Sequence, residues 1–444
     1  MSTHSFFGRA AKRSELFLRL LLGFHLGMEK WRRLLLVLAL FLAFFSARSQ
    51  SFIGVNYGQV ADNLPPPSAT ASLLQSTTIS KLRLYGADPA IIRSLSGTNI
   101  SLVLGVPNSD IPSLAADPSA AASWATANVL SYVPAASISL VAVGNEALDS
   151  GDAALASQLL PAMRNLRSAL AASGVKVSTV HTMSVLAHSE PPSSGAFRPE
   201  LSADLTWILQ FLRDTGSPFM INPYPFFAYR SDPRPETLAF CLFQPNPGRF
   251  DAGSRLMYTN MFDAQVDAVR SALNGLGFPE VEIVVAETGW PYRGDPDEVG
   301  TTVENAGAFT GNLVAHLRSM VGTPLMPGRS VDTYIFALYD EDLKPGPASE
   351  RSFGLYRADQ TMNYDAGLVK SASSSYTSPS PPAGTTGLTP PAGRCVPGAT
   401  PDRSADGRST QPEAQCHSPD AVGSRAADGA DRLFCLSVAL TLLL

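Results

Sequence analysis

Two glutamates in this sequence each follow a Val-rich apolar segment and stand where polar or small residues begin. Glu146 lies in 139–148 (SLVAVGNEAL), and Glu287 lies in 282–291 (EIVVAETGWP). Two carboxyl groups presented at strand ends are the minimum equipment for cleaving a glycosidic bond. A salt-bridged glutamate with a purely structural role is the alternative interpretation of each one.

Other side chains near the ends of apolar segments could bind a sugar. Asn145 precedes Glu146, and its amide could hydrogen-bond a hydroxyl group whose interaction strengthens in the transition state. Aromatic rings at strand ends can stack on the apolar faces of pyranose units, whereas aromatic residues inside strands are usually core. We expect such contacts from Tyr57, Tyr85, Tyr224 and Trp290, while Phe226 and Phe227 could equally be packing residues.

The elements that must position these residues follow a regular alternation. Short Val/Ile/Leu-rich runs predict eight strands, at 52–58, 79–86, 100–107, 138–148, 175–183, 219–226, 283–290 and 331–339. Apolar residues at helical spacing predict helices between them, including 154–172, 203–215, 261–276 and 303–321. This alternation predicts an α/β fold, a (β/α)8 TIM barrel. An open doubly wound sheet is the alternative, but no Gly-rich phosphate loop follows the first strand.

The barrel gives the two glutamates a common location. Glu146 would end the fourth strand and Glu287 the seventh, so both carboxyl groups would point into one mouth of the barrel. Burying a carboxyl group there costs free energy unless the group is solvated or paired. The presence of two such groups across one mouth disfavours the alternative of salt-bridged glutamates with a purely structural role. The segment 231–259, after the sixth strand, is long and rich in Pro, Phe and Gly. We expect it to carry a small subdomain that forms a wall of the substrate cleft.

Composition limits the class of protein. The chain has 444 residues, of which 45% are hydrophobic and 16% charged, with a net charge of −5, as is typical of a globular protein. No basic stripe runs through the sequence, which disfavours nucleic acid as a partner. Cys241 is alone in the globular region and is expected to be a buried free thiol. His181 ends the fifth strand without other His or Cys residues at metal-ligand spacing, so we expect neither a metal nor a cofactor.

Both ends of the chain resemble targeting signals. A basic segment that begins at Met28 precedes an apolar run at 34–45 and then small residues, so 1–51 is assigned to an upstream extension and a secretory signal peptide. The globular domain, 52–370, is followed by a Ser/Pro/Thr-rich linker at 371–394 and a poorly structured tail at 395–432. The apolar segment 433–444 fits a GPI-anchor signal, with an incidental hydrophobic end as the alternative. Asn99 begins a glycosylation sequon ahead of the third strand, on the face opposite the predicted site.

Three motifs resemble those of a known family. NEA after a Val-rich strand, AETGWP after another and GVNYG at the start of the domain are similar to motifs of the plant glucan endo-1,3-β-glucosidases of glycoside hydrolase family 17. The resemblance implies that Glu146 is the proton donor and that Glu287 is the nucleophile of a retaining enzyme. It also implies that Glu341 and Lys344 border the cleft, while their spacing of three residues leaves a solvated surface ion pair as the alternative. The sequence RCVP at 394–397 resembles the opening of a Cys-rich carbohydrate-binding module found in the family, but the expected Trp and the remaining cysteines are missing, so we predict that this module is absent or degenerate.

The resemblance implies a secreted, membrane-anchored endo-hydrolase of 1,3-β-glucan polysaccharide, which we expect to be a monomer. A retaining mechanism requires the two carboxyl groups to lie about 5–5.5 Å apart. It also requires the pKa of Glu146 to be raised, by burial and by Glu287, while Glu287 stays ionised. A hydrolase of mixed 1,3;1,4-β-glucan and a catalytically silent glucan-binding wall protein are the alternatives.

Overall fold

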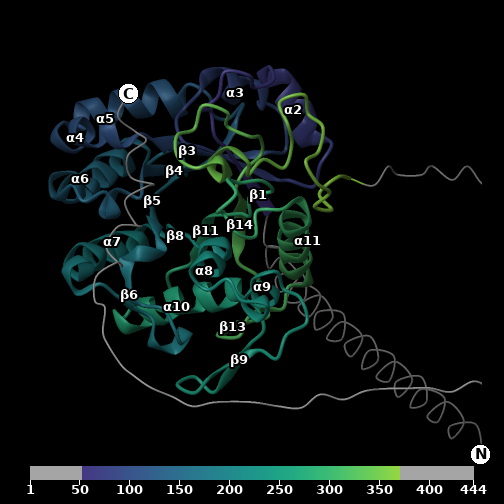
Figure 1. The fold of residues 1–444 in the computed structure, drawn as a ribbon. Helices are drawn as coiled ribbons and strands as arrows, with labels where there is room; N and C mark the ends of the chain where they lie inside the picture. The colour runs from purple at the N-terminus through teal and green to yellow at the C-terminus, as the bar shows by residue number, and fades with distance from the viewer. Residues whose placement is uncertain (1–52, 371–444) are drawn as a thin grey trace, which may run out of the picture. The chain divides into compact units, whose positions relative to one another are not determined.

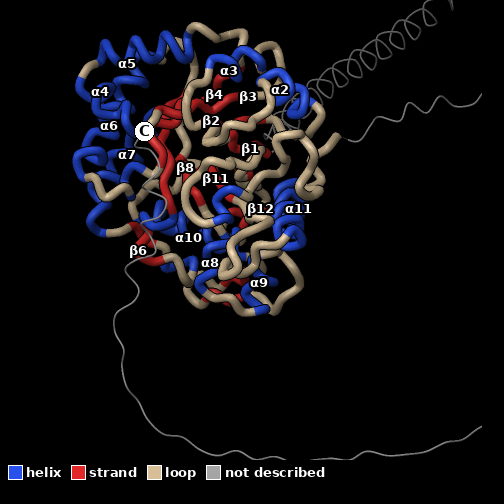
Figure 2. The backbone as a smooth tube through the Cα atoms, turned by 45° about the horizontal axis from the view of Figure 1, so that its top comes forward, coloured by secondary structure: helices blue, strands red, loops and turns tan. Residues whose placement is uncertain are grey.

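The protein folds around a closed barrel of parallel strands. The structure, a computed structural model, describes residues 53–370. The strands are hydrogen-bonded in the order β1-β14-β11-β8-β5-β4-β3-β2, and the helices lie around the outside of the barrel (Figures 1 and 2). The barrel strands are β1 (Ile53–Tyr57), β2 (Lys81–Leu84), β3 (Ser101–Val106), β4 (Ser137–Asn145), β5 (Lys176–Thr182), β8 (Phe219–Asn222), β11 (Ile283–Thr288) and β14 (Asp332–Ile335). The predicted (β/α)8 TIM barrel is confirmed, and all eight predicted strands are present.

The helices alternate with these strands. They are α2 (Pro67–Gln75), α3 (Pro89–Ser94), α4 (Ile111–Ala116), α5 (Pro118–Ala125), α6 (Ala153–Ala169), α7 (Ser202–Thr215), α8 (Pro225–Ser231), α9 (Pro235–Cys241), α10 (Met261–Gly275) and α11 (Val303–Ser319). The four predicted helices correspond to α6, α7, α10 and α11. Short helical turns complete the connections: η1 (Asn108–Asp110), η2 (Thr126–Leu130), η3 (Ala147–Asp149), η4 (Met183–Val185), η5 (Pro192–Ser194), η6 (Pro199–Leu201) and η7 (Ala348–Arg351).

The eighth strand is followed by an irregular segment in place of an outer α-helix. Within residues 53–370, the chain after β14 forms only the turn η7 and then returns along the outside of the barrel to α2. There the amide of Lys370 donates to the carbonyl oxygen of Ser76, and the amide of Thr78 donates to that of Leu368. These hydrogen bonds join the last described residues to the end of α2 and the residues that follow it. The predicted signal peptide, linker, tail and C-terminal apolar segment (1–51, 371–394, 395–432 and 433–444) lie outside the described residues.

Apolar side chains inside the barrel explain why the strands are Val- and Leu-rich on both faces. One buried cluster contains strand residues only, and it fills the barrel interior as expected for parallel barrel strands. Its members are Val103, Leu140, Ala142, Val180, Met220, Val284, Ala286 and Tyr334. The opposite faces of the strands pack against the helices in a second, larger cluster. Both faces of the sheet are therefore removed from water, and polar side chains within the strands, such as Asn56, Arg83 and His181, are buried with them.

The strands are shorter than the predicted runs, and β2, β8 and β14 are only about half as long as 79–86, 219–226 and 331–339. The run 219–226 ends as a strand at Asn222, because Pro223 and Pro225 have no N–H for the ladder and Pro225 begins α8. The run 331–339 ends as a strand at Ile335. Beyond it the amide of Leu338 donates to the carbonyl oxygen of Asn56, and Tyr339 pairs with Tyr356. The final residues of that run keep single hydrogen bonds to the neighbouring strands β1 and β11 and otherwise pair with the segment 353–356.

The long segment after the sixth barrel strand is ordered as a small subdomain, as predicted. It contains α9 and an antiparallel hairpin of β9 (Arg249–Asp251) and β10 (Leu256–Tyr258). The carboxylate of Asp251 fixes the hairpin, because it accepts hydrogen bonds from the backbone and side chain of Ser193 in η5. Two further antiparallel pairs lie in other connections: β6 (Leu186–His188) with β7 (Ala196–Phe197), and β12 (Gly322–Thr323) with β13 (Met326–Pro327).

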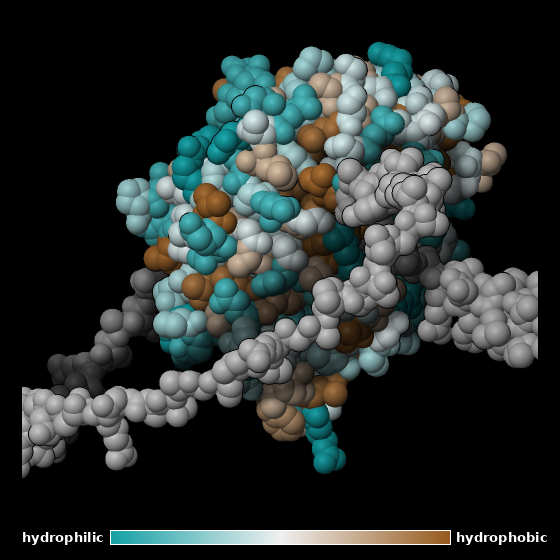
Figure 3. Space-filling model, turned by 90° about the vertical axis from the view of Figure 1, so that its right-hand side faces the viewer, coloured by the Kyte–Doolittle hydropathy of each residue, from teal (hydrophilic) through white to brown (hydrophobic). Residues whose placement is uncertain are grey.

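The surface of the described region is mixed in character. On the face drawn in Figure 3, hydrophobic residues are interspersed with hydrophilic ones. The most exposed large apolar side chains are on separate elements, such as Trp207 on α7 and Phe250 on the hairpin. None of the helices formed by residues 53–370 combines the length and the apolar character needed to cross a membrane.

Candidate active site

The two glutamates lie at the carboxyl ends of the fourth and seventh barrel strands, as predicted. Glu287 is the fifth residue of β11, and Glu146 directly follows β4. The chain turns sharply at the end of β4, where Gly144 and Glu146 both have left-handed backbone conformations with φ of 69° and 56°. The amide of Glu146 still donates to the carbonyl oxygen of Val180, at 2.9 Å. This turn holds the Glu146 side chain at the mouth of the barrel beside β5.

Glu287 is buried but surrounded by hydrogen-bond donors. Its Oε1 atom accepts from Nη1 of Arg83 at 2.6 Å and from the hydroxyl of Tyr85 at 2.8 Å. Its Oε2 atom accepts from the hydroxyl of Tyr224 at 3.0 Å. Burial, and next the charge of Glu287, raise the pKa of Tyr85 and of Tyr224 well above the ordinary value, so both hydroxyls remain protonated donors. The site thus stabilises a negative charge on Glu287.

Arg83 joins the two segments that carry the glutamates, and no sequence motif pointed to it. Its guanidinium is 2% exposed, bonds Glu287 through Nη1 and donates from Nη2 to Oδ1 of Asn145 at 2.7 Å. Burial lowers the pKa of Arg83, but the electrostatic interactions with Tyr85 and Glu287 outweigh burial, and the net shift of the pKa is upward. A charged residue between two leucines of a barrel strand, as Arg83 is in 81–84 (KLRL), is a signal that could have revealed it, because a buried charge needs a partner.

Glu146 is held in a different environment. Among the described residues, its carboxyl group accepts one hydrogen bond, which Nδ2 of Asn222 donates to Oε1 at 2.7 Å. Burial, and then the nearby charge of Glu287, raise the pKa of Glu146 to about 7. The carboxyl group therefore holds a proton at mildly acidic pH, as a general acid must. Asn222 was also missed, although an asparagine that ends an apolar strand before a proline is a signal of the same kind.

Asn108 supports the segment that carries Glu146. Its Nδ2 donates to the carbonyl oxygen of Asn145 at 3.0 Å, and its Oδ1 accepts from the amide of Asn145 at 2.9 Å. This pair of hydrogen bonds fixes the peptide groups on both sides of Asn145, between the two left-handed residues. Asn108 lies in the turn after β3, so its contribution depends on how β3 and β4 are aligned.

Glu341 and Lys344 lie close to this cluster but do not form the ion pair that their spacing suggests. Glu341 is buried and accepts from the amide of Val60 at 3.0 Å, and a Cβ atom at Gly58 would overlap its carboxyl group. Burial raises the pKa of Glu341. Lys344 pairs instead with Glu350 at 3.1 Å. Burial lowers the pKa of Lys344, but the carboxylates of Glu350, Glu341 and Glu287 outweigh it and raise the pKa overall.

The predicted aromatic residues divide into two groups. Tyr85 and Tyr224 bond Glu287, and both pack edge-on against Phe336, whose ring also lies 4.5 Å from Nζ of Lys344. Trp290 is fully buried against α8 and α11, and Tyr57 is 2% exposed and packs against Tyr339. Sugar stacking by Trp290 or Tyr57 stays a prediction that this packing does not favour, because both side chains are almost completely buried.

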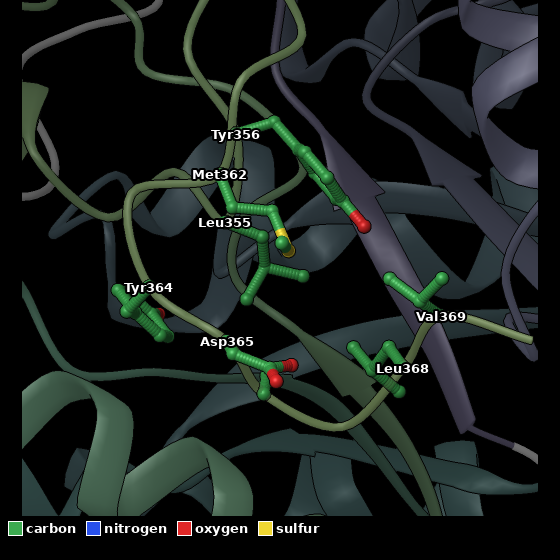
Figure 4. Close-up of a pocket in the computed structure, with 8 residues that line it drawn as sticks. Leu355, Tyr356, Met362, Tyr364, Asp365, Leu368 and Val369 are labelled. Atoms are coloured by element: carbon green, nitrogen blue, oxygen red, sulfur yellow. The ribbon is translucent and has the colours of Figure 1, made fainter. Parts of the chain in front are cut away.

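Two other features lie apart from the carboxylate cluster. Residues 53–370 contain no group of three metal-ligating side chains that could hold an ion. His181 stacks on Phe219, and burial lowers its pKa to about 3, so it is an uncharged packing residue. A shallow pocket is drawn in Figure 4. The returning C-terminal segment lines it, and none of its residues belongs to the site: Leu355, Tyr356, Met362, Tyr364, Asp365, Ala366, Leu368 and Val369.

Comparison with known proteins gives a consistent result. The model of the family "Glycosyl hydrolases family 17" matches residues 53–368. Glucan endo-1,3-beta-glucosidase 7 of Arabidopsis thaliana is 59% identical over 408 residues, which cover 88% of this chain and 80% of that protein. Glucan endo-1,3-beta-D-glucosidase of Olea europaea is 52% identical over 412 residues, which cover 89% of each chain.

Solved structures agree with the sequence comparison. CJP38, a beta-1,3-glucanase and allergen of Cryptomeria japonica pollen, superposes with a TM-score of 0.67 at 40% identity and covers 71% of this chain and 98% of its own. A structure of plant beta-glucan endohydrolases with distinct substrate specificities gives a TM-score of 0.65 at 36% identity, covering 70% and 99% of the two chains. The chain therefore belongs to glycosyl hydrolases family 17.

Proposed function

We propose that this protein is a glucan endo-1,3-β-glucosidase, which hydrolyses internal 1,3-β-D-glucosidic linkages by a retaining double displacement. The observation that carries the proposal is the contrast between its two buried carboxyl groups. Glu287 receives three hydrogen bonds, one of them from a guanidinium, whereas Glu146 receives one, from a neutral amide. The pKa of Glu146 is raised to about 7, so this residue can hold a proton while Glu287 carries a charge.

In the first step, the Glu287 carboxylate attacks the anomeric carbon of a bound glucosyl unit. The bond between that carbon and the glycosidic oxygen breaks, and Glu146 gives its proton to the departing oxygen. The products of this step are a shortened glucan with a free hydroxyl group and a glucosyl ester on Glu287. Glu146 is left as a carboxylate.

In the second step, Glu146 acts as a base. It takes a proton from a water molecule, whose oxygen attacks the anomeric carbon while the ester bond to Glu287 breaks. Both side chains return to their initial protonation states, and two inversions restore the β configuration. A separation of about 5–5.5 Å between the two carboxyl groups, which this mechanism requires, stays a prediction.

The surrounding residues support substrate binding. Because Arg83 donates to Oδ1 of Asn145, the Nδ2 group of Asn145 is left to donate to a sugar hydroxyl. Tyr85 and Tyr224 are partly exposed beside Glu287, and Glu341 and Lys344 place further polar groups near it. We assign these residues to the glucan-binding surface and the subdomain at 231–259 to one wall of the cleft.

The decisive experiment measures reducing sugar released from a linear 1,3-β-glucan, with mixed 1,3;1,4-β-glucan as the competing substrate. The proposal expects strong preference for the linear glucan and the loss of nearly all activity in Glu287→Gln. Preference for the mixed-linkage glucan would show that it, rather than the linear glucan, is the substrate. Activity that survives in Glu287→Gln would overturn the assignment of Glu287 as the nucleophile. Binding of glucan without hydrolysis would indicate a silent wall protein, which the intact carboxyl groups and their donors disfavour.

We also propose that the protein acts outside the cell, attached to the outer face of the plasma membrane by a GPI anchor. The apolar segments at the two ends of the sequence support this proposal. Asn99 is exposed and lies just ahead of β3, away from the catalytic ends of the strands, so a glycan there leaves the cleft open. Release of the expressed protein from plant membranes by a phosphatidylinositol-specific phospholipase tests the anchor, and retention on the membrane after treatment would contradict it.

A further inference from the structure

Asn222 lies at the end of the sixth barrel strand with its side chain against the predicted acid/base. Its Nδ2 atom donates to Oε1 of Glu146 at 2.7 Å, and the residue is 4% exposed. The neighbouring Pro223 and Pro225 end the strand and begin α8, so the backbone on this side of Asn222 is constrained. The amide is therefore held in place by the barrel and not by the substrate.

We propose that Asn222 is a positioning residue that determines which oxygen of Glu146 transfers the proton. Oε1 is occupied as an acceptor by the Asn222 amide, so the proton resides on Oε2. This inference deepens the proposed function and rests on it.

The same hydrogen bond serves both steps of the reaction. When Glu146 is neutral, Oε1 is the carbonyl oxygen and accepts from Asn222, while Oε2–H points away and gives its proton to the glycosidic oxygen. When Glu146 is charged, Oε1 still accepts, and Oε2 takes the proton from water. No proton passes through Asn222, and the carboxyl group need not rotate between the steps.

The other groups around Glu146 act on its charge without fixing an oxygen. Glu287 and Asp149 raise its pKa and Arg83 lowers it, each through the distance between charges. Arg83 is itself bonded to Glu287 and Asn145, and the side chain of Asp149 accepts from Thr182 and pairs with Arg198. Among residues 53–370, Asn222 alone gives the Glu146 carboxyl a directional contact.

The orientation of the Asn222 amide is critical. Its Oδ1 atom is buried and has no hydrogen-bond partner within the described part of the chain. If the amide turned round, Oδ1 would face Oε1 of Glu146 and could accept a proton from it. The proton would then be held between the two side chains instead of pointing to the substrate. Asn222→Asp reproduces this situation, because it places an acceptor at both positions.

The experiment compares two substrates across pH. One is a linear 1,3-β-glucan, and the other is a 1,3-linked β-glucoside of a nitrophenol, whose leaving group departs without a proton. For Asn222→Ala and Asn222→Asp we expect kcat/KM on the glucan to fall about 10–100-fold. The loss of kcat/KM on the nitrophenyl substrate should be much smaller. This parameter reports only the steps up to the glucosyl ester, and with this substrate those steps need no proton from Glu146. Both variants remove the amide that donates to the charged form of Glu146, so the pKa of Glu146 should rise. The alkaline limb of the kcat/KM profile on the glucan should therefore move up by about one pH unit.

Controls separate this inference from stability and from the proposed function. Asn165→Ala removes an amide that donates to the backbone outside the barrel, and it should leave both the substrate ratio and the pH profile unchanged. Thermal unfolding shows which variants are folded, and Asn222→Asp, which keeps the side-chain shape, serves if the alanine variant unfolds. Equal losses on both substrates with an unshifted alkaline limb would overturn the inference. A wild-type protein inactive on glucan would instead overturn the proposed function.

Discussion

The guanidinium of Arg83 contacts Glu287 through one nitrogen and Asn145 through another, at 2.6 and 2.7 Å. These partners belong to the seventh and fourth barrel strands, and Arg83 belongs to the second. One buried cation thus fixes the proposed nucleophile, Glu287, relative to the segment that carries the proposed acid/base, Glu146. The alignment of the two carboxyl groups depends on this residue as well as on the strands themselves.

Arg83→Lys should show the importance of that bridge. A lysine keeps the charge but cannot reach both partners in the planar geometry of a guanidinium. We expect kcat on 1,3-β-glucan to fall about 100-fold, a loss typical of removing one preorganised donor from a transition state. Steady-state kinetics measure this loss. Arg213→Lys, on the partly exposed outer surface of α7, is the matched control and should retain wild-type kcat. A wild-type kcat in Arg83→Lys would show that the bridge is not required.

Activity should decrease on the alkaline side as Glu146 loses its proton. The pKa of this group is raised to about 7 by burial and by Glu287, and the first step requires its protonated form. The kcat/KM for 1,3-β-glucan should therefore fall tenfold per pH unit well above pH 7. A profile measured between pH 4 and 9 tests this. An alkaline limb that persists unchanged in Glu146→Gln, measured with a nitrophenyl substrate, would assign the limb to another group.

The same shift has a consequence for stability. A glutamate whose pKa is higher in the folded state binds more protons there than in the unfolded chain, so the free energy of unfolding falls as pH rises from about 4.5 to about 7. Glu146→Gln removes the titrating group and should make unfolding less dependent on pH in this window. We expect the variant to be more stable than the wild type at pH 7.5 by about 1–2 kcal/mol. Urea unfolding at pH 5 and 7.5 measures the difference, and equal slopes against pH in both proteins would contradict it.

Much of the fold was predictable because the signals are local. Runs of Val, Ile and Leu are long enough to fill both faces of a barrel strand, and a glutamate at the end of such a run stands out. The strand ends were less predictable. At 219–226 the prolines ended the strand early, and at 331–339 the final residues pair mainly with the returning segment 353–356.

The partners of the glutamates could not be read from spacing. Arg83 is 204 residues from Glu287 in sequence, and Asn222 is 76 from Glu146, so each pairing depends on barrel closure. Lys344 has Glu341 three residues away, yet it pairs with Glu350 because η7 brings that carboxylate within reach. Tertiary packing also decides which aromatic rings are exposed, as the buried ring of Trp290 shows.

Asn108→Ala should reduce activity by disturbing the turn that carries Glu146. Its amide makes two hydrogen bonds to the backbone of Asn145, which lies between the left-handed residues Gly144 and Glu146. Losing both should lower the free energy of unfolding by about 1–3 kcal/mol. Because the freed turn can move Glu146 away from the substrate, kcat should also fall about tenfold. Asn165→Ala removes two comparable hydrogen bonds to the backbone outside the barrel and should lower stability without lowering kcat. A contradictory result would be equal losses of stability in Asn108→Ala and Asn165→Ala with kcat unchanged in both, measured below their unfolding temperatures. Asn108 would then not be needed to hold Glu146 in its catalytic position.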